Sequence, residues 1–528
     1  MLAQVLVAAL VLLVPYLWTR IRFKRLQQYA RFPQLPASAV LGHLQVVDDF
    51  IRRLPPKAHP NMAFAAIHDS LGRPPVVFVD LRPASSPMLV IGSFEVAEQI
   101  IKATNLFPHS PPKALDGWAH LVHLTGTRSI MTAKDEEWKM LRKRFNPGFA
   151  HQNLMTLLPS IVTSVSTFLD HLDDFARTGE AFTLQTLTTD LTFDIMGKVA
   201  LDIDIGAQTS QPTEFLRYFR ALIETYTGDQ IQLPRWCTPL LEWKRTRLAK
   251  QARTELQAII RAKFAERATN TQSRSVLAIS LEDMETLSPD TLDLTCDQLS
   301  SFLFAGHDTT STTICWMIYE LSRSPRALRA LREELAGTFG AHASRETIIS
   351  LLLGPKGSEL MNRMTYASAV IKETLRLWPS GATARMTQPG DGLTASIRIG
   401  DKTEAFNLDG LMLYHVHTII QRDPAVFGEN ADQFVPERWL DGDEKFPAGA
   451  WRPFERGPRN CIGQALALIE ARVVLAMVVG RYEFDKVGLG EARVGEDGQV
   501  EVAQELYMTM QVTPKPVDGM LMRVRLAH

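Results

Sequence analysis

Cysteine is scarce in this sequence, which has four cysteines among 528 residues. They are widely spaced and none belongs to a C-x-x-C pair, so the sequence predicts a reducing compartment and no disulfide framework. Net charge is nearly absent as well, at −1, and nothing in the sequence indicates a nucleic-acid-binding protein. Internal repeats and low-complexity blocks are also lacking. Apolar residues, in contrast, make up 45% of the chain, which is ample for a large core.

An uncharged apolar segment opens the chain. It runs from Leu2 to Trp18, and a cluster of arginines and lysines follows at 20–25. A helix of this length spans roughly 26 Å, which is short but workable for a bilayer. A cleaved signal peptide carries its positive charges before the apolar part, so the order found here favours a single-pass transmembrane signal-anchor over 1–19. The positive-inside rule then places the rest of the chain in the cytosol.

Residue patterns predict the main elements of the remaining chain. The segment 20–36 is expected to be a basic hinge that Pro33 and Pro36 stiffen. Two β-branched runs on either side of P-A-S-S-P predict a hairpin within 75–92. Helical patterns fill most of 151–265. Further strands are expected at 396–399, 412–417, 506–512 and 521–526.

One cysteine stands apart because of its neighbours. Residues 454–463 read F-E-R-G-P-R-N-C-I-G, and an apolar segment from about Gln464 to Tyr482 predicts a buried helix after them. Cys461 therefore lies just ahead of a helix N-terminus, where free N–H groups and the dipole favour a thiolate. Gly457 permits a tight backbone around the sulfur, and Gly463 lets a flat group come close. Such a thiolate suits an axial bond to haem iron; the alternative is a buried, inert cysteine.

This decapeptide matches every fixed position of Phe-x-x-Gly-x-Arg-x-Cys-x-Gly, and the chain thereby resembles the cytochrome P-450 family. The resemblance implies that Cys461 is the proximal ligand to the iron of haem b, that Phe454 shields the sulfur and that Arg459 pairs with a haem propionate. It also implies one catalytic haem domain over 37–528. The implied fold is mainly α-helical with a small β region, and it holds the haem between a long central helix and the cysteine-bearing loop.

A second match lies in a long helix expected from about Ser288 to Ser324. Its middle, S-F-L-F-A-G-H-D-T-T-S-T-T-I, is locally a poor helix former, and such a conflict often marks function. We expect the Thr309 hydroxyl to bond the Ala305 carbonyl four residues back and to open the helix there. A-G-x-D-T-T resembles the family's oxygen-activating motif, which implies Asp308 as the acid and Thr309 as the hydroxyl for proton delivery. Ala305 and Gly306 would leave room for dioxygen; a kinked polar core helix is the alternative.

Further arginine motifs resemble the family's haem contacts. In E-E-W-K-M-L-R-K-R-F, Trp138 and Arg142 lie four residues apart, hence on one helix face. The resemblance implies that they clamp a haem propionate, although such a pair also occurs by chance. Arg385 is implied as another propionate partner.

A third group of motifs is implied to be structural. Glu373 and Arg376 in K-E-T-L-R would by themselves be a surface ion pair of little value. Together with P-E-R-W they resemble the family's Glu-x-x-Arg and Pro-Glu-Arg-Phe pair, so that Arg438 would complete a buried cluster. Trp439 replaces the commoner phenylalanine of that motif and keeps an aromatic ring.

The resemblance implies substrate contacts in an irregular segment at 107–130, just after Pro379 and near the C-terminus. The residues are Trp118, Leu121, Leu124, Ile130, Ala382, Thr383 and Tyr507. For the four residues within 107–130, ordinary loop packing is an equally good explanation.

The resemblance implies a haem-thiolate monooxygenase that inserts one atom of O2 into a hydrophobic organic substrate. NADPH electrons would arrive through a separate NADPH–cytochrome P-450 reductase, because the chain has no flavin or nicotinamide motif. The layout resembles fungal microsomal members that act in secondary-metabolite biosynthesis at the endoplasmic reticulum membrane. Two alternatives stay open: a reductase-independent haem-thiolate isomerase or dehydratase, and a non-catalytic membrane-anchored haem-binding protein.

Overall fold

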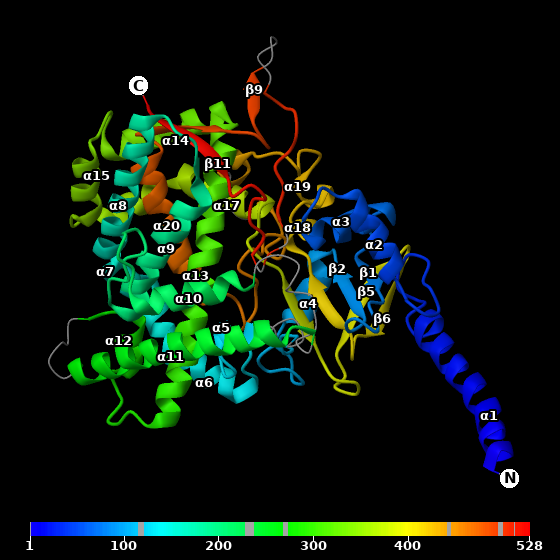
Figure 1. Cartoon of the computed structure of the whole chain (residues 1–528). Coiled ribbons are helices and arrows are strands. Elements are labelled where there is room, and N and C mark those ends of the chain that lie inside the picture. Colours follow the sequence, from blue (N-terminus) through cyan, green and yellow to red (C-terminus); the bar gives the residue numbers. More distant parts are fainter. Residues whose placement is uncertain are drawn as a thin grey trace. The chain divides into compact units, whose positions relative to one another are not determined.

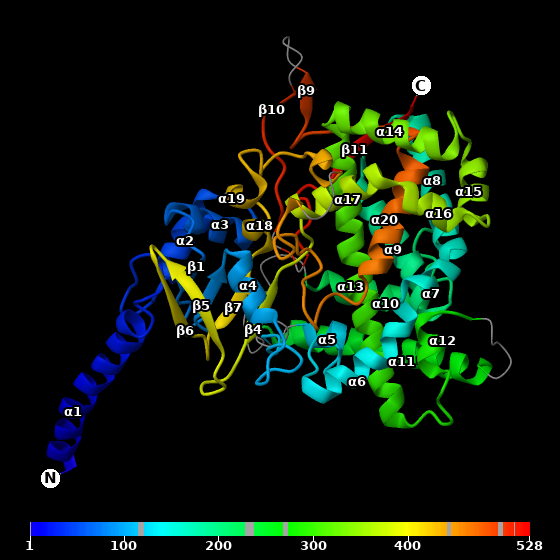
Figure 2. The same cartoon turned by 180° about the vertical axis from the view of Figure 1, so that it is seen from behind.

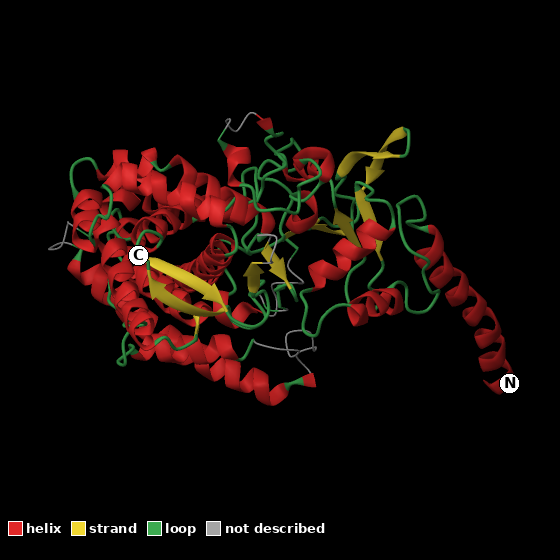
Figure 3. Ribbon diagram, turned by 90° about the horizontal axis from the view of Figure 1, so that it is seen from above, coloured by secondary structure: helices red, strands yellow, loops and turns green. Residues whose placement is uncertain are grey.

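The structure is a computed structural model that describes residues 2–114, 121–226, 237–267, 273–440, 445–494, 500–509, 511 and 513–527. The chain divides into two compact units. Unit 1 consists of Met1–Ala114, Ala382–Val426 and Gly449–Arg459, and unit 2 consists of Leu115–Gly381, Phe427–Ala448 and Asn460–His528. Helices dominate and the sheets are small, which confirms the predicted fold class (Figures 1 and 3).

Unit 1 is built on a sheet with the strand order β1-β2-β7-β4. β1 (Val76–Val79) and β2 (Met88–Ile91) pair antiparallel, which confirms the predicted hairpin. β2 runs parallel to β7 (Met412–His415), and β7 pairs antiparallel with β4 (Thr383–Met386). Successive side chains of a strand point to opposite faces, and here both faces are buried, each in an apolar cluster of its own.

The other elements of unit 1 surround this sheet. A second pair, β5 (Thr394–Ile399) with β6 (Lys402–Asn407), contributes to one of the two apolar clusters. The helices are α1 (Leu2–Arg22), η1 (Phe23–Gln27), α2 (Leu44–Arg53), α3 (Pro60–Ser70), α4 (Phe94–Ile101) and α18 (His417–Ile420); α19 (Pro424–Phe427) lies at the boundary with unit 2.

The segment after α1 is fastened to the rest of unit 1. Arg25 Nη1 lies 2.9 Å from the Asp80 carboxylate, whose side chain is fully buried. Phe32 belongs to the apolar cluster on one face of the sheet. The predicted hinge is therefore packed at these two residues. Among the residues that the structure describes, no helix is both long and apolar enough to cross a membrane.

Unit 2 is organised around the predicted long helix, α13 (Pro289–Ser322). The Ser288 hydroxyl caps it by accepting from Thr291 N at 3.1 Å, and Pro289 occupies the first helical position. Figures 1 and 2 show α13 among the other helices of this unit, and it packs against α9 (Leu184–Met196) most extensively.

The helix after the cysteine, α20 (Gln464–Val478), also follows the prediction, although Tyr482 belongs to the next strand. The remaining helices of unit 2 are α5 (Val122–Thr125), α6 (Asp135–Phe145), η3 (Asn146–Phe149), α7 (His151–Thr156), α8 (Leu158–Thr178), η4 (Gly197–Leu201), α10 (Glu214–Glu224), α11 (Pro239–Glu266), α12 (Val276–Leu281), α14 (Pro325–Phe339), α15 (Arg345–Leu353), α16 (Gly357–Arg363), α17 (Thr365–Leu377) and η7 (Pro436–Trp439).

Two small sheets complete unit 2. β11 (Leu521–Leu526) lies between β3 (Phe182–Thr183) and β8 (Tyr482–Lys486), and β9 (Ala492–Val494) pairs with β10 (Val500–Val502). The strand predicted at 506–512 was wrong for the described residues there. They form an isolated bridge from Met508 to Pro516, and Thr509 N donates to the Lys515 carbonyl at 2.7 Å.

Candidate functional site

Cys461 lies where the sequence predicts, just ahead of a helix N-terminus. α20 begins at Gln464 with Gly463 as its N-cap, and the Cys461 side chain is exposed. A Cβ atom built at Gly463 would meet only the Cys461 sulfur, at 3.9 Å, so this side of the loop is clear for a flat group. Cys296 and Cys315 differ, because burial raises the pKa of each thiol to about 12 and keeps it unreactive.

Arg142 holds the cysteine loop directly. Its Nη1 donates to the Asn460 carbonyl at 2.9 Å, and its Nη2 donates to Asn460 Oδ1 at 2.8 Å. Trp138, four residues earlier on α6, is buried. Sequence reasoning missed Asn460, because nothing local signals a contact between residues so far apart in the chain. The predicted propionate contact of Trp138 and Arg142 stays a prediction.

The signature crosses the boundary between the units along the chain, and Phe454 to Arg459 belong to unit 1. Gly457 has a positive φ of 74°, and a Cβ atom there would lie 2.7 Å from the Ile101 carbonyl, so the turn requires glycine. The Phe454 ring packs edge-on against Trp451, and Arg459 is buried. Their predicted contacts with sulfur and propionate stay predictions.

Arg385 is a fully buried arginine in β4 of unit 1. Its Nη1 donates to the Pro111 carbonyl at 3.4 Å, while Nε and Nη2 are buried and have no hydrogen-bond partner among the described residues. Burial lowers the pKa of this guanidinium to about 10, although the nearby Glu455 carboxylate acts in the opposite direction. Buried donors are normally satisfied, so this arrangement favours an anionic partner for Arg385.

The predicted oxygen-site residues form a strip along α13. From Ser301 to Leu321 every residue of this helix is buried except Ala305, Gly306 and Thr309. The Thr309 hydroxyl donates to the Ala305 carbonyl at 2.8 Å, which confirms the predicted bond. The expected opening of the helix was wrong, because α13 remains continuous there.

Gly306 has a second explanation. A Cβ atom at this position would overlap the Met196 side chain of α9, so the close packing of α9 against α13 also favours glycine unless Met196 changes its side-chain conformation. Its predicted role beside dioxygen stays a prediction.

Asp308 is a buried carboxylate with a partner that sequence reasoning missed. Lys515 Nζ lies 2.5 Å from its Oδ1, and the Thr513 side chain also hydrogen-bonds it. Burial works against ionisation, but the Lys515 ammonium, His307 and the Thr513 bond outweigh it and hold the pKa of Asp308 below its ordinary value. Asp308 is thus an ion-paired group tied to the C-terminal segment, and its predicted role as an acid stays a prediction.

The histidine beside this aspartate is a packing residue. The His307 ring stacks on Phe193 with ring centroids 3.8 Å apart, and Nδ1 lies 2.8 Å from the Leu303 carbonyl. Burial lowers the pKa of His307 to about 4, so the ring is neutral at ordinary pH.

The structure brings together the predicted Glu373, Arg376 and Arg438. Arg376 Nε and Nη2 donate to Glu373 at 2.8 and 2.9 Å, and Arg438 Nε donates at 2.8 Å. The Trp439 indole N–H adds a bond to Glu373 at 3.0 Å, which a phenylalanine could not make. All three charged side chains are buried, so this is a structural cluster and not a surface pair.

The predicted substrate residues differ in how exposed their side chains are. Leu121, Leu124 and Ile130 are buried, Ala382, Thr383 and Tyr507 are partly exposed, and Trp118 lies outside the described residues. Their contact with a substrate stays a prediction.

Comparison with known proteins decides the family. The sequence model named Cytochrome P450 matches residues 39–501. The chain belongs to the cytochrome P450 family. This P450 is 31% identical over 507 residues to cytochrome P450 monooxygenase acrF of Aspergillus aculeatus, which covers 89% of this chain and 98% of the relative. It is 30% identical over 490 residues to cytochrome P450 monooxygenase polC of Polytolypa hystricis, which covers 87% and 83%.

A third relative of this P450 is a fusion. The bifunctional cytochrome P450/NADPH–P450 reductase of Gibberella moniliformis is 28% identical over 84% of this chain, and the match covers 37% of the relative. The family implies a haem iron, and the residues present fit that group. Cys461 is an exposed thiol beside a clear glycine face, and the spare buried donors of Arg385 suit a propionate.

Proposed function

We propose that this P450 is a monooxygenase that inserts one atom of O2 into a hydrophobic organic substrate. The observation that carries the proposal is the partly exposed strip of Ala305, Gly306 and Thr309 in an otherwise buried helix. Haem, when bound through Cys461, supplies the binding and reductive cleavage of dioxygen. Relatives named as monooxygenases over most of both chains support the same function.

The chain's own part in this reaction is to hold and move protons. The Thr309 hydroxyl donates a hydrogen bond to the Ala305 carbonyl. Its oxygen can therefore accept a hydrogen bond from a water molecule beside the strip. Asp308 can replenish that proton supply only if it separates from Lys515, because their ion pair holds the carboxylate ionised. We propose Thr309 as the immediate proton-holding group and Asp308 as its source.

The electrons would come from NADPH through a separate reductase. The chain has no flavin or nicotinamide motif, and the Gibberella moniliformis relative joins a matching P450 part to an NADPH–P450 reductase. The relatives acrF and polC are named as monooxygenases and come from fungi, and on this likeness we propose a fungal secondary-metabolite pathway for this chain. An untargeted comparison of metabolites with and without the gene identifies the substrate.

Thr309→Ala tests the proposal once that substrate is known. We expect unchanged haem content but much less product and more hydrogen peroxide per NADPH, since positioned proton transfer contributes about 10²–10⁴-fold. Thr312→Ala is the matched control, because Thr312 makes the same type of bond, to the Asp308 carbonyl at 2.9 Å, from a buried position. Equal product per NADPH in wild type and Thr309→Ala contradicts the role of this helix.

Two alternative functions can be distinguished from the proposed one by measuring turnover with and without NADPH and O2. A rearranging or dehydrating P450 turns over without NADPH and O2, whereas the proposed monooxygenase needs both. A non-catalytic binder would show a thiolate-type carbon monoxide spectrum but no turnover. That spectrum should disappear in Cys461→Ser, because a serine hydroxyl is a poor iron ligand.

We also propose that α1 attaches the chain to the endoplasmic reticulum membrane with the catalytic part in the cytosol. The support is a run of exposed apolar side chains from Val11 to Trp18 ahead of basic residues. Deleting residues 2–22 should release the protein from membranes and retain the ion pair between Arg25 and Asp80. Deleting 2–25 should release it too, but at lower stability. Complete membrane sedimentation of the 2–22 deletion means that another surface attaches the chain.

A further inference from the structure

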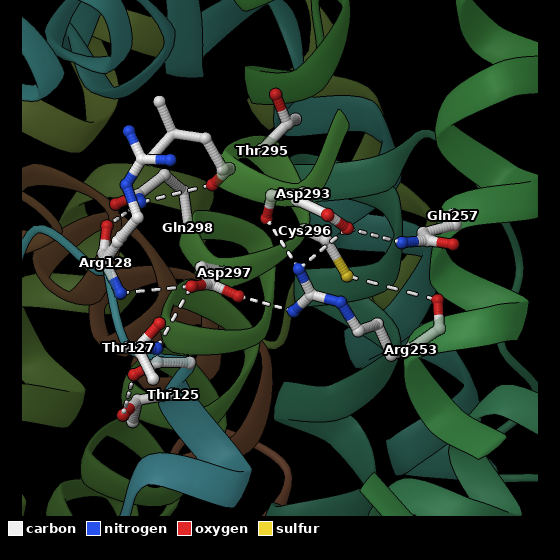
Figure 4. Close-up of polar contacts among 12 residues, drawn as sticks. Thr125, Thr127, Arg128, Arg253, Gln257, Asp293, Thr295, Cys296, Asp297 and Gln298 are labelled. Atoms are coloured by element: carbon white, nitrogen blue, oxygen red, sulfur yellow. Dashed lines mark hydrogen bonds and ion pairs between the residues drawn. The ribbon is translucent and has the colours of Figure 1, made fainter. Parts of the chain in front are cut away.

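A buried aspartate holds the loop that precedes α6. The Asp297 side chain on α13 is 6% exposed, and its Oδ2 accepts from the backbone N–H groups of Thr127 and Arg128, both at 3.0 Å. Figure 4 shows this carboxylate pointing at the two consecutive residues of the loop. We call residues 125–130 the 125–130 loop. Its centre is thus fixed by one side chain of the central helix.

Two more side chains of α13, those of Gln298 and Ser301, hydrogen-bond the main chain of the same loop. Gln298 Oε1 accepts from Ile130 N at 2.7 Å, and its Nε2 donates to the Arg128 carbonyl at 2.7 Å. Ser301 Oγ donates to the Thr125 carbonyl at 2.8 Å. Main-chain groups from one end of the loop to the other are therefore bonded by side chains of α13.

The loop is also shaped to receive the carboxylate. Gly126 has a positive φ of 73°, and a Cβ atom there would lie 2.1 Å from Asp297 Cγ. The carboxylate therefore occupies the space of the missing side chain. Any larger residue at Gly126 would displace the aspartate from the two N–H groups.

The same carboxylate reaches a second helix. Arg253 on α11 places Nη1 2.5 Å from Asp297 Oδ1, and its Nη2 bonds Asp293 at 3.0 Å (Figure 4). Asp293 is 54% exposed and has no bond to the 125–130 loop among the described contacts, whereas Asp297 is nearly inaccessible. The guanidinium balances a buried charge whose other oxygen orders the loop.

We propose that Asp297 is the positioning residue of the 125–130 loop and that Arg253 makes the order of this loop depend on α11. The loop lies beside Leu124 and includes Ile130, two of the predicted substrate contacts. Movement of α11 away from α13 removes the positive partner of Asp297, and the carboxylate then attracts water and loosens its bonds to the loop. The shape of the substrate-facing wall is in this way set by a helix that carries none of the predicted contacts.

Hydrogen exchange on the haem-loaded full chain tests both halves of this proposal. Asp297→Asn should speed exchange of the Thr127 and Arg128 amides by about tenfold or more, the size expected on losing bonds to a charged group. Arg253→Met should speed exchange of the same amides, although it touches neither. Asp293→Asn is the matched control: it contacts the same arginine and should leave the loop unchanged.

Each result decides one point. If Arg253→Met leaves the loop amides at the wild-type rate while Asp297→Asn speeds them, then Asp297 only fastens the loop and the coupling to α11 is wrong. If Asp297→Asn itself leaves them unchanged, the positioning role is wrong. Should Asp297→Asn fail to fold, the Arg253→Met comparison with Asp293→Asn still decides the coupling.

A second measurement asks whether the coupling reaches the substrate side, and only this part rests on the proposed function. Clotrimazole and imidazole both bind haem iron through nitrogen, but only clotrimazole is large enough to contact a pocket wall. In Arg253→Met and Asp297→Asn we expect clotrimazole to dissociate several-fold faster than from the wild type, and the dissociation rate of imidazole to be unchanged. If the dissociation rates of both azoles change by the same factor, the link to the pocket is wrong. A wild-type chain without a thiolate-type carbon monoxide spectrum contradicts the proposed function and leaves the exchange result intact.

Discussion

Arg376 and Arg385 are both completely buried arginines, yet their surroundings are opposite. Arg376 makes two bonds to Glu373 and further bonds to the carbonyls of Ala431 and Gln433, at 2.5 to 3.1 Å. Arg385 makes one long bond, and its Nε and Nη2 have no partner among the described residues. A saturated buried cation belongs to the fold, whereas an unsaturated one indicates a binding site for an anion. Burial alone therefore does not separate structural from functional residues.

The largest expected effect on stability is that of Arg376→Leu. It leaves Glu373 buried with one arginine and should lower the free energy of unfolding by roughly 3–5 kcal/mol, because a buried charge loses its main partner. We expect little soluble, haem-loaded protein, as judged by expression level and urea unfolding. Arg438→Leu should be milder, since Arg438 contributes a single bond to Glu373. A stable, haem-loaded but inactive Arg376→Leu protein would reverse the assignment and make this cluster catalytic.

Lys515→Met is expected to have a smaller effect that depends on pH. In the wild type the pKa of Asp308 is lowered, so the ion pair stabilises the fold above the ordinary aspartate pKa and this contribution is lost as pH falls through the lowered value. Without Lys515 the dominant remaining influence is burial, which raises the pKa, so the variant should lose stability as pH rises. The difference in the free energy of unfolding between the wild type and Lys515→Met should grow from pH 5 to pH 7, by about 1.4 kcal/mol per unit of change in the pKa of Asp308.

Urea unfolding at several pH values measures this difference. The double variant Asp308→Asn with Lys515→Met is the control, because it has neither charge and its stability should not show this pH dependence. If the free energies of unfolding of the wild type and Lys515→Met differ by the same amount from pH 5 to pH 7, the ion pair does not control the ionisation of Asp308. Lys515 thus represents an intermediate case, a partly exposed cation paired with one buried carboxylate.

Sequence reasoning succeeded where the interacting residues are close in the chain. The Thr309 bond to Ala305 and the Glu373–Arg376 pair follow from helix geometry alone. The hairpin of β1 and β2 and the start of α20 are likewise local. Such interactions can be recognised from the order and spacing of the residues alone.

Contacts between distant segments could not be predicted in the same way. Lys515 is far from Asp308 in the chain, and Arg142 is far from Asn460, so no spacing links them. Asp297 is one of several polar residues in α13, and no motif or spacing distinguishes it from the others. Its function becomes visible only when the 125–130 loop is packed against it.

Arg385→Leu should have the smallest effect on the fold. The side chain makes one long bond to protein, so a leucine of similar bulk removes a poorly satisfied buried charge, and the haem-free chain should unfold at the same or a higher urea concentration. Haem should bind less tightly by ~10- to 100-fold, since a propionate would lose hydrogen bonds to a charged donor worth about 1.5–3 kcal/mol. The haem-to-protein ratio and the haem-free unfolding curve measure the two effects separately. Arg385→Lys should recover part of the affinity, because an ammonium keeps the charge but cannot form the planar fork. If Arg385→Leu instead destabilises the haem-free chain as strongly as Arg376→Leu, the contrast between the two arginines fails, and unsaturated donors do not distinguish a binding residue from a structural one.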